Sequence, residues 1–238
     1  MPRHLFSIAN PITGFEYAEH GFLGDNITLR LDNKTNTAST VPLLLPNGLL
    51  ATYGQINGLA GDFYGTTDPI SDGVTFQDQC DRFSAAWAML AVDGTRQPGE
   101  ALALLKILDL EVKTINNALA NHVDPSTAYA TLPDQTMQFE QLTLARPINE
   151  PSYLGLSKIN WDHFGDDART AYDAGHTVAI QEALKGNDQQ SLHNAYAINA
   201  FADHFLEDSF SAGHTRTPRR QLHSLSGDAD LCAKVRTY

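Results

Sequence analysis

Residues 188–211 read DQQSLHNAYAINAFADHFLEDSFS, and this stretch predicts a long helix that carries candidate metal ligands. As the N-cap of a helix, the Asp188 side chain can accept hydrogen bonds from backbone N–H groups of the first turn. Gly213 is expected to stop that helix. His204 and Asp208 are four residues apart in it, so their side chains project from one face about one turn apart. That geometry suits two ligands of one cation.

Other segments also predict helices. Residues 76–90 and 100–119 are expected to form two core-facing helices. The second carries an apolar stripe at helical spacing, made of Leu104, Leu108, Val112, Ile115 and Leu119. Asp166 or Asp167 can cap a further helix that stops near Gly186.

Less regular structure is expected in the rest of the chain. The first 75 residues are rich in Gly, Asn, Thr and Pro, and residues 52–63 favour a helix only weakly. Four prolines in residues 121–157 indicate a long connection, and strands such as residues 27–31 are short and isolated. We therefore expect one all-α domain over residues 1–238, a multi-helix fold with long irregular connections.

Composition restricts the classes of function. The chain has 42% hydrophobic and 18% charged residues, which is typical of a globular protein. Its net charge of -12 makes a nucleic-acid partner unlikely by whole-chain electrostatics, although bound divalent cations would reverse the local sign in a cleft. No run reaches the roughly 20 apolar residues of a transmembrane segment, and no signal peptide is visible. The sequence leaves the oligomeric state open.

The histidines and carboxylates near the C-terminal end suggest a metal site. An isolated His and Asp pair on an exposed helix can be an accidental hydrogen bond. Here the pair lies beside apolar residues, which are Ala202, Phe205, Leu206 and Phe210, and a polar pair beside a buried stripe needs partners. His214 follows the expected helix end and can reach back. A carboxylate such as Asp208 can bridge two cations, whereas a neutral imidazole offers one nitrogen.

Residues 202–214, ADHFLEDSFSAGH, resemble the H-x3-D-x5-H signature of bacterial zinc-dependent phospholipases C. That family is related to the fungal single-strand-specific zinc nucleases. The resemblance implies a mostly helical fold that holds up to three zinc ions. It implies that His204 binds one zinc, that Asp208 bridges this zinc to another, and that His214 binds a further zinc.

Three upstream residues extend the resemblance over most of the chain. His163, in NWDHF, stands before a helix as the family's upstream His ligand does; it could also be a packing histidine. Asp62, in LAGDFYG, resembles the family's zinc-binding aspartate and candidate general base; it could also cap a turn between glycines. His20 lies at about the expected distance before Asp62 to be the N-terminal His ligand.

The pattern breaks at both ends. The family completes its zinc set with a downstream His and carboxylate, whereas this sequence offers His223 and then Asp228 or Asp230. Either His223 substitutes, or the C-terminal part of the pattern is missing because the chain is truncated. The family also uses a processed N-terminal amine as a ligand, and Met1 lies nineteen residues before His20.

The resemblance implies a phosphodiesterase of lipid degradation. Its substrate would be a phosphatidylcholine-type lipid at a membrane surface, and its products diacylglycerol and a phosphorylated headgroup. Relatives are mostly secreted, so a secreted or periplasmic location is the expectation. One alternative is a zinc nuclease, which would stack bases on aromatic side chains such as Tyr53, Tyr64 and Trp161. The other is a non-catalytic fragment that zinc only stabilises.

Overall fold

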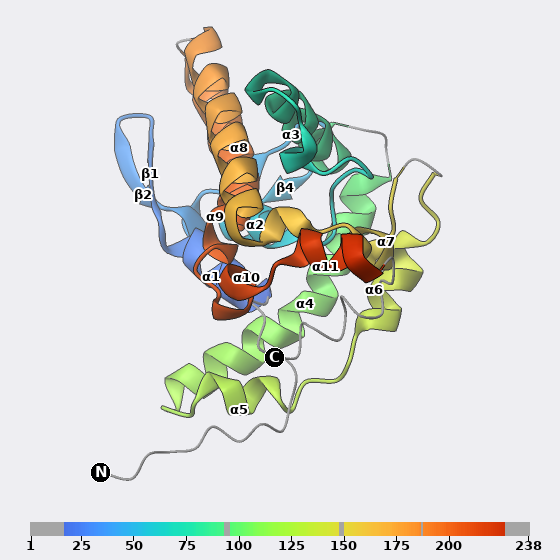
Figure 1. Cartoon of the computed structure of the whole chain (residues 1–238). Helices are drawn as coiled ribbons and strands as arrows, with labels where there is room; N and C mark the ends of the chain where they lie inside the picture. The colour runs from blue at the N-terminus through green and yellow to red at the C-terminus, as the bar shows by residue number, and fades with distance from the viewer. Residues whose placement is uncertain (1–16, 93–95, 148–149, 187, 227–238) are drawn as a thin grey trace, which may run out of the picture.

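The computed structural model describes residues 17–92, 96–147, 150–186 and 188–226, and it confirms the all-α prediction (Figure 1). The N-terminal elements are α1 (Tyr17–Asn26), β1 (Thr28–Leu31), β2 (Lys34–Thr37), η1 (Ala38–Thr40), β3 (Leu43–Leu44), β4 (Leu50–Ala51), α2 (Tyr53–Leu59) and η2 (Ile70–Asp72). The central elements are α3 (Phe76–Ala91), α4 (Gln97–Ala120), α5 (Pro125–Tyr129), α6 (Thr136–Thr143) and α7 (Tyr153–Lys158). The C-terminal elements are η3 (Trp161–His163), α8 (Gly165–Gly186), α9 (Gln189–Asp208), α10 (Ala212–Arg216) and α11 (Arg219–Ser226).

Helix α9 lies at the centre of the molecule. It packs along α8, with α2 and α1 against it from another side, and α3 packs on α8 (Figure 1). Asp188 caps it as predicted, because its side chain accepts a hydrogen bond from the backbone N–H of Ser191. The ring of Phe201 is fully buried and meets the rings of Phe83 and Trp87 edge-on. This apolar packing fixes α9, and with it the side chains at its C-terminal end.

Helices α1 and α2 approach so closely that glycine is needed between them. A Cβ atom on Gly54 would clash with the carbonyl oxygen of Gly21 and lie 2.8 Å from Cγ of Asp25. The side chain of Asp25 accepts a hydrogen bond from the backbone N–H of Gly54 at 2.9 Å. This contact places His20 of α1 beside Asn57 at the end of α2.

Replacing Gly54 with Ala should therefore destabilise the protein by about 1–3 kcal/mol, because the added methyl group forces α1 and α2 apart. The matched control is Gly99→Ala, since a Cβ atom there meets nothing within 4 Å in helix α4. That change should be neutral or stabilise by up to about 1 kcal/mol. Urea unfolding of both variants measures the difference, and equal stability would contradict the close approach.

Two predicted boundaries are wrong. Residues 121–157 are not a long irregular connection, because α5, α6 and most of α7 lie within them. Two of the four prolines lie at helix starts: Pro125 is the first residue of α5, where a missing N–H costs nothing, and Pro151 precedes the cap of α7. Helix α9 ends at Asp208 rather than near Gly213, which lies inside α10.

Smaller differences concern three further segments. The first 75 residues hold more regular structure than expected, with α1 and two short antiparallel hairpins, although the predicted strand over residues 27–31 is confirmed as β1. Helix α8 begins at Gly165, so Asp166 lies in its first turn. A negative charge there stabilises the helix through its favourable interaction with the helix dipole. The predicted core stripe of α4 stops short, because Leu119 is 45% exposed.

Candidate metal centre

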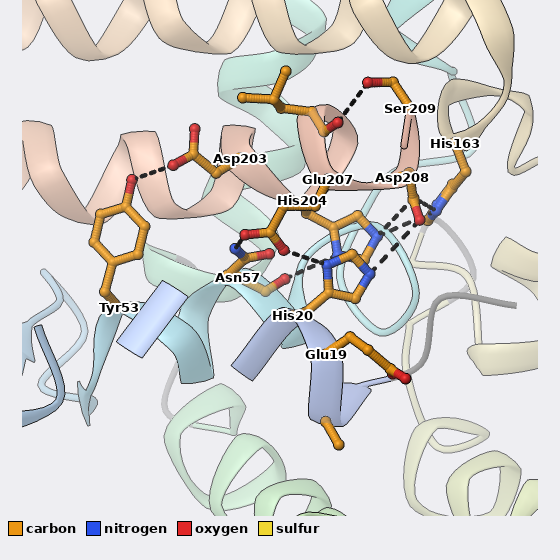
Figure 2. A network of polar contacts seen from close by, with 12 residues as sticks. Glu19, His20, Tyr53, Asn57, His163, Asp203, His204, Glu207, Asp208 and Ser209 are labelled. Atoms are coloured by element: carbon orange, nitrogen blue, oxygen red, sulfur yellow. Dashed lines mark hydrogen bonds and ion pairs between the residues drawn. The ribbon is translucent and has the colours of Figure 1, made fainter. Parts of the chain in front are cut away.

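One buried carboxylate, Asp208, lies among four imidazoles. Its Oδ2 is 2.6 Å from Nδ1 of His163 and 3.4 Å from Nε2 of His204. Its Oδ1 is 2.9 Å from Nδ1 of His214 and 3.6 Å from Nε2 of His20. Figure 2 shows the carboxylate with three of these rings converging on it. The structure thus brings together five of the six predicted ligands.

These five residues come from four elements, of which α9 and α10 follow each other directly in the sequence. His20 is on α1, His163 ends η3, His204 and Asp208 are on α9, and His214 is on α10. His20, His163, His204 and Asp208 are each at most 3% exposed. Burying so many titratable groups is costly unless they are paired or bind a cation. The cluster is therefore a candidate site rather than a surface coincidence.

The sixth predicted ligand, Asp62, lies at the edge of the cluster. It is half-buried, and one of its carboxylate oxygens lies within 4.8 Å of ring nitrogens of His163 and His204. The preceding Gly61 has a φ of +63°, and a Cβ atom on it would come within 2.8 Å of Nε2 of His163. Glycine at this position therefore allows both the turn and the approach of the backbone to the imidazole.

Burial and charge oppose each other in the cluster. Burial lowers the pKa of His20, but its contacts with Asp208 and Glu207 outweigh this effect and raise the pKa to about 10. Burial raises the pKa of Asp208, but His163 and His204 hold it well below its usual range. Burial lowers the pKa of His204 well below its usual range, and the charge of His20 adds to the effect. The site therefore contains an ionised carboxylate and at least one neutral imidazole.

The hydrogen bond of His204 fixes which nitrogen can bind a metal. Its Nδ1 lies 2.9 Å from the backbone carbonyl oxygen of Asn57, which can only accept a hydrogen bond. Nδ1 therefore carries the hydrogen, and Nε2 of the neutral ring keeps its lone pair. Nε2 is also the nitrogen that faces Asp208. Orientation of a metal-binding imidazole by a backbone carbonyl is common in metal sites.

The ligand atoms form two groups that could each hold an ion. His20, His204 and Asp208 form one group, and Asp62, His163 and His204 form the other. His204 belongs to both, yet its one unprotonated nitrogen, Nε2, can bind only one ion; it lies 3.2 Å from Nδ1 of His163. Asp208 touches imidazoles of both groups and has two oxygens, so it is the residue that can bridge two ions.

The first group fits zinc in chemistry and spacing. Two ligands about 2.1 Å from one zinc at the tetrahedral angle are about 3.4 Å apart. Nε2 of His204 lies 3.4 Å from Oδ2 of Asp208, and Nε2 of His20 lies 3.6 Å from its Oδ1. Each distance is at or beyond the limit for a hydrogen bond but close to the ligand spacing around zinc. Among the described residues, Oδ1 of Asp208 is buried without a hydrogen bond, and its 2.9 Å approach to His214 lacks hydrogen-bond geometry. Such an oxygen suits a cation.

No protein-family model, curated protein or solved structure matches this chain. The candidate site therefore rests on its own geometry. Among the described helices, none has the length and apolar character to cross a membrane.

A neighbouring carboxylate, Asp162, holds His163 in place. It accepts hydrogen bonds from the backbone N–H of Ile70 at 2.6 Å, and from the backbone N–H and hydroxyl of Ser71 at 3.0 and 2.5 Å. These bonds tie η3 to η2. Asp162 is thus occupied as a hydrogen-bond acceptor and supports the site from outside it.

The first of the downstream candidates, His223, does not join the cluster. His223 packs against Trp161, with ring centroids 5.4 Å apart, and no described contact links it to Asp208. Asp228 and Asp230 lie outside the described residues, as does Met1. Nδ1 of His176 lies 2.6 Å from Oδ1 of Asn199 on α9, so this histidine is paired outside the cluster.

Sequence reasoning missed two residues of the site, Glu207 and Asn57. Glu207 contacts Nδ1 of His20 at 2.7 Å, and its other oxygen accepts a hydrogen bond from the Asn57 side chain at 2.8 Å (Figure 2). Glu207 directly precedes Asp208, and this second carboxylate beside the H-x3-D motif is the signal by which the sequence could have indicated it. Asn57 carried no signal, since its role depends on how α2 packs on α9.

Proposed function

We propose that this chain is a zinc-dependent phosphodiester hydrolase, with phosphatidylcholine-type lipids as its favoured substrates. The observation that carries the proposal is the contact of one buried carboxylate, Asp208, with four imidazoles, beside the more exposed Asp62. A site with several ions suits phosphate esters, whose reaction concentrates negative charge on oxygen. The resemblance of residues 202–214 to phospholipases C names the substrate class.

Each residue has a defined part in this proposal. Zinc ions held by the cluster would neutralise charge on the phosphate oxygens and lower the pKa of water. His20, His204 and Asp208 would hold one ion, and His163 with Asp62 would hold another. Asp62 is the least buried of these groups, so it is the one that a water molecule and a substrate can reach. It acts as the general base by accepting a proton from the attacking water.

The lipid substrate is favoured over single-stranded nucleic acid by the state of the aromatic side chains. Tyr53 and Tyr64 are each 1% exposed, so neither can stack on a base. Trp161 is half-buried and already lies under the guanidinium of Arg220 at 5.2 Å. The net charge of -12 further disfavours a polyanion.

A paired assay tests the function. The full chain is loaded with zinc, its zinc content is measured, and hydrolysis of a phosphatidylcholine analogue and of single-stranded DNA is followed before and after chelation. We expect at least two zincs per chain and release of phosphocholine that chelation abolishes and zinc restores. Nucleotide release instead would indicate a nuclease. About one zinc and no hydrolysis of either substrate would indicate a zinc that only stabilises the fold.

A further inference from the structure

We propose that Glu207 and Asn57 are positioning residues that fix the tautomer and the orientation of His20, so that its Nε2 is presented to a metal ion shared with Asp208. The inference rests on the metal centre of the proposed function but not on its substrate. It concerns side chains that lie behind the ligands and touch neither ion nor substrate.

The carboxylate of Glu207 is held between two donors. Its Oε1 accepts a hydrogen bond from Nδ2 of Asn57 at 2.8 Å, and its Oε2 lies 2.7 Å from Nδ1 of His20. An ionised carboxylate only accepts, so Nδ1 of His20 carries a hydrogen. In the neutral ring the lone pair then sits on Nε2, which is the nitrogen 3.6 Å from Oδ1 of Asp208. Metal-binding imidazoles commonly donate a hydrogen bond from one ring nitrogen to a carboxylate while the other ring nitrogen binds the metal.

Asn57 orients a second imidazole at the same time. Its backbone carbonyl accepts from Nδ1 of His204 at 2.9 Å, while its side chain holds Glu207. The rings of His20 and His204 consequently stack, with centroids 4.1 Å apart and planes 20° apart. Both rings turn Nδ1 towards the Asn57 side and Nε2 towards Asp208, as Figure 2 shows. One residue of α2 therefore sets the direction of both.

The arrangement is rigid because the residues are enclosed. Asn57 is 0% exposed, and Glu207 is 14% exposed at its side chain. The close contact of α1 with α2 keeps His20 within reach of both. A buried amide that donates to Glu207 prevents the carboxylate from turning to another partner, so the contact with His20 is maintained.

The test compares zinc affinity in four variants of the full chain, measured by chelator competition. Glu207→Ala should bind zinc about 10- to 100-fold more weakly, which is the usual cost of losing an outer partner of a ligand. Glu207→Gln should lose less, because its amide carbonyl can still accept from Nδ1 of His20. Asn57→Ala should resemble Glu207→Gln, since its backbone carbonyl still holds His204.

The matched control is Asp203→Asn. Asp203 lies one turn before Glu207 on α9 and also contacts α2, through a 2.7 Å hydrogen bond from the hydroxyl of Tyr53, but it touches no ligand imidazole. Its zinc affinity should stay within about threefold of the unchanged protein, since it contributes nothing to ligand orientation. Circular dichroism confirms the fold of every variant.

A spectroscopic readout separates positioning from general weakening. In the zinc-loaded protein, correlation spectra of the imidazole ring should show a protonated Nδ1 in His20, and this signal should be lost or shifted in Glu207→Ala only. Unchanged affinity in Glu207→Ala and Asn57→Ala, or equal losses in Glu207→Ala and Asp203→Asn, would overturn the proposal. A loss in Glu207→Gln as large as in Glu207→Ala would instead make Glu207 a ligand. If the unchanged chain binds zinc but hydrolyses no phosphodiester, only the proposed function fails.

Discussion

Replacing Asp208 with Asn should abolish tight zinc binding. The carboxylate contacts the ring nitrogens of His20, His163, His204 and His214, and it is 1% exposed. An amide keeps the shape but removes the negative charge and one acceptor, so the cations lose their only fully buried anionic ligand in the cluster. We expect zinc affinity to fall by about 1000-fold or more, which corresponds to about 4 kcal/mol. Chelator competition on the full chain measures this loss.

The zinc-free Asp208→Asn protein should also be less stable. His20 and His163 have raised pKa values because of their contacts with carboxylates, and removing Asp208 takes one carboxylate from each, although Glu207 still contacts His20. Breaking a buried ion pair from one side costs about 3–5 kcal/mol. The stability contributed by a raised histidine pKa is present below the unfolded value near 6.5 and is lost as pH rises towards 10. The destabilisation should therefore be larger at pH 6 than at pH 10.

Asp203→Asn serves again as the control, because it changes a carboxylate of the same helix that contacts none of the four histidines. It should keep zinc affinity. If Asp208→Asn bound zinc as tightly as the unchanged chain, the cluster would be a hydrogen-bonded network and not a metal centre.

The sequence predicted the local part of the site well. His204 and Asp208 are four residues apart in a helix, and their geometry follows from the helical repeat alone. The helix start at Asp188 was also predictable, because capping is a local interaction. The long-range part depended on the family resemblance, since no periodicity relates His20 or His163 to a helix that follows much later in the chain.

The errors came from treating local signals as independent of their surroundings. The prolines of residues 121–157 predict a connection, although proline is favoured as the first residue of a helix, as at Pro125. Gly213 predicts a helix stop, although a new helix starts after Ser211 and brings His214 back to Asp208. The role of Asn57 could not be predicted from the sequence, because it depends on how α2 packs against α9.

Replacing Asp62 with Asn should remove catalysis while most of the zinc remains bound. Asp62 contributes to one of the two ligand groups only, whereas His20, His204 and Asp208 form the other without it. Asn keeps an oxygen that can face a cation but cannot accept a proton from water at neutral pH. Loss of a general base lowers turnover by about 10²- to 10⁴-fold. The measurement is kcat for a phosphatidylcholine analogue at saturating zinc, together with zinc content per chain.

The control for Asp62 is Asp68→Asn, which removes an equal charge from an exposed residue of a pocket that Gly61 and His163 also line. Its turnover should stay close to that of the unchanged chain, because the described hydrogen bonds of Asp68 join its backbone to the hydroxyl of Thr66 and involve no ligand imidazole. Near-normal turnover in Asp62→Asn would remove Asp62 from the mechanism. Equal losses in both variants would mean that negative charge near the pocket matters, rather than proton transfer at Asp62. Loss of turnover together with most of the zinc would mean that Asp62 acts chiefly by holding metal, and its role as general base would then lose its support.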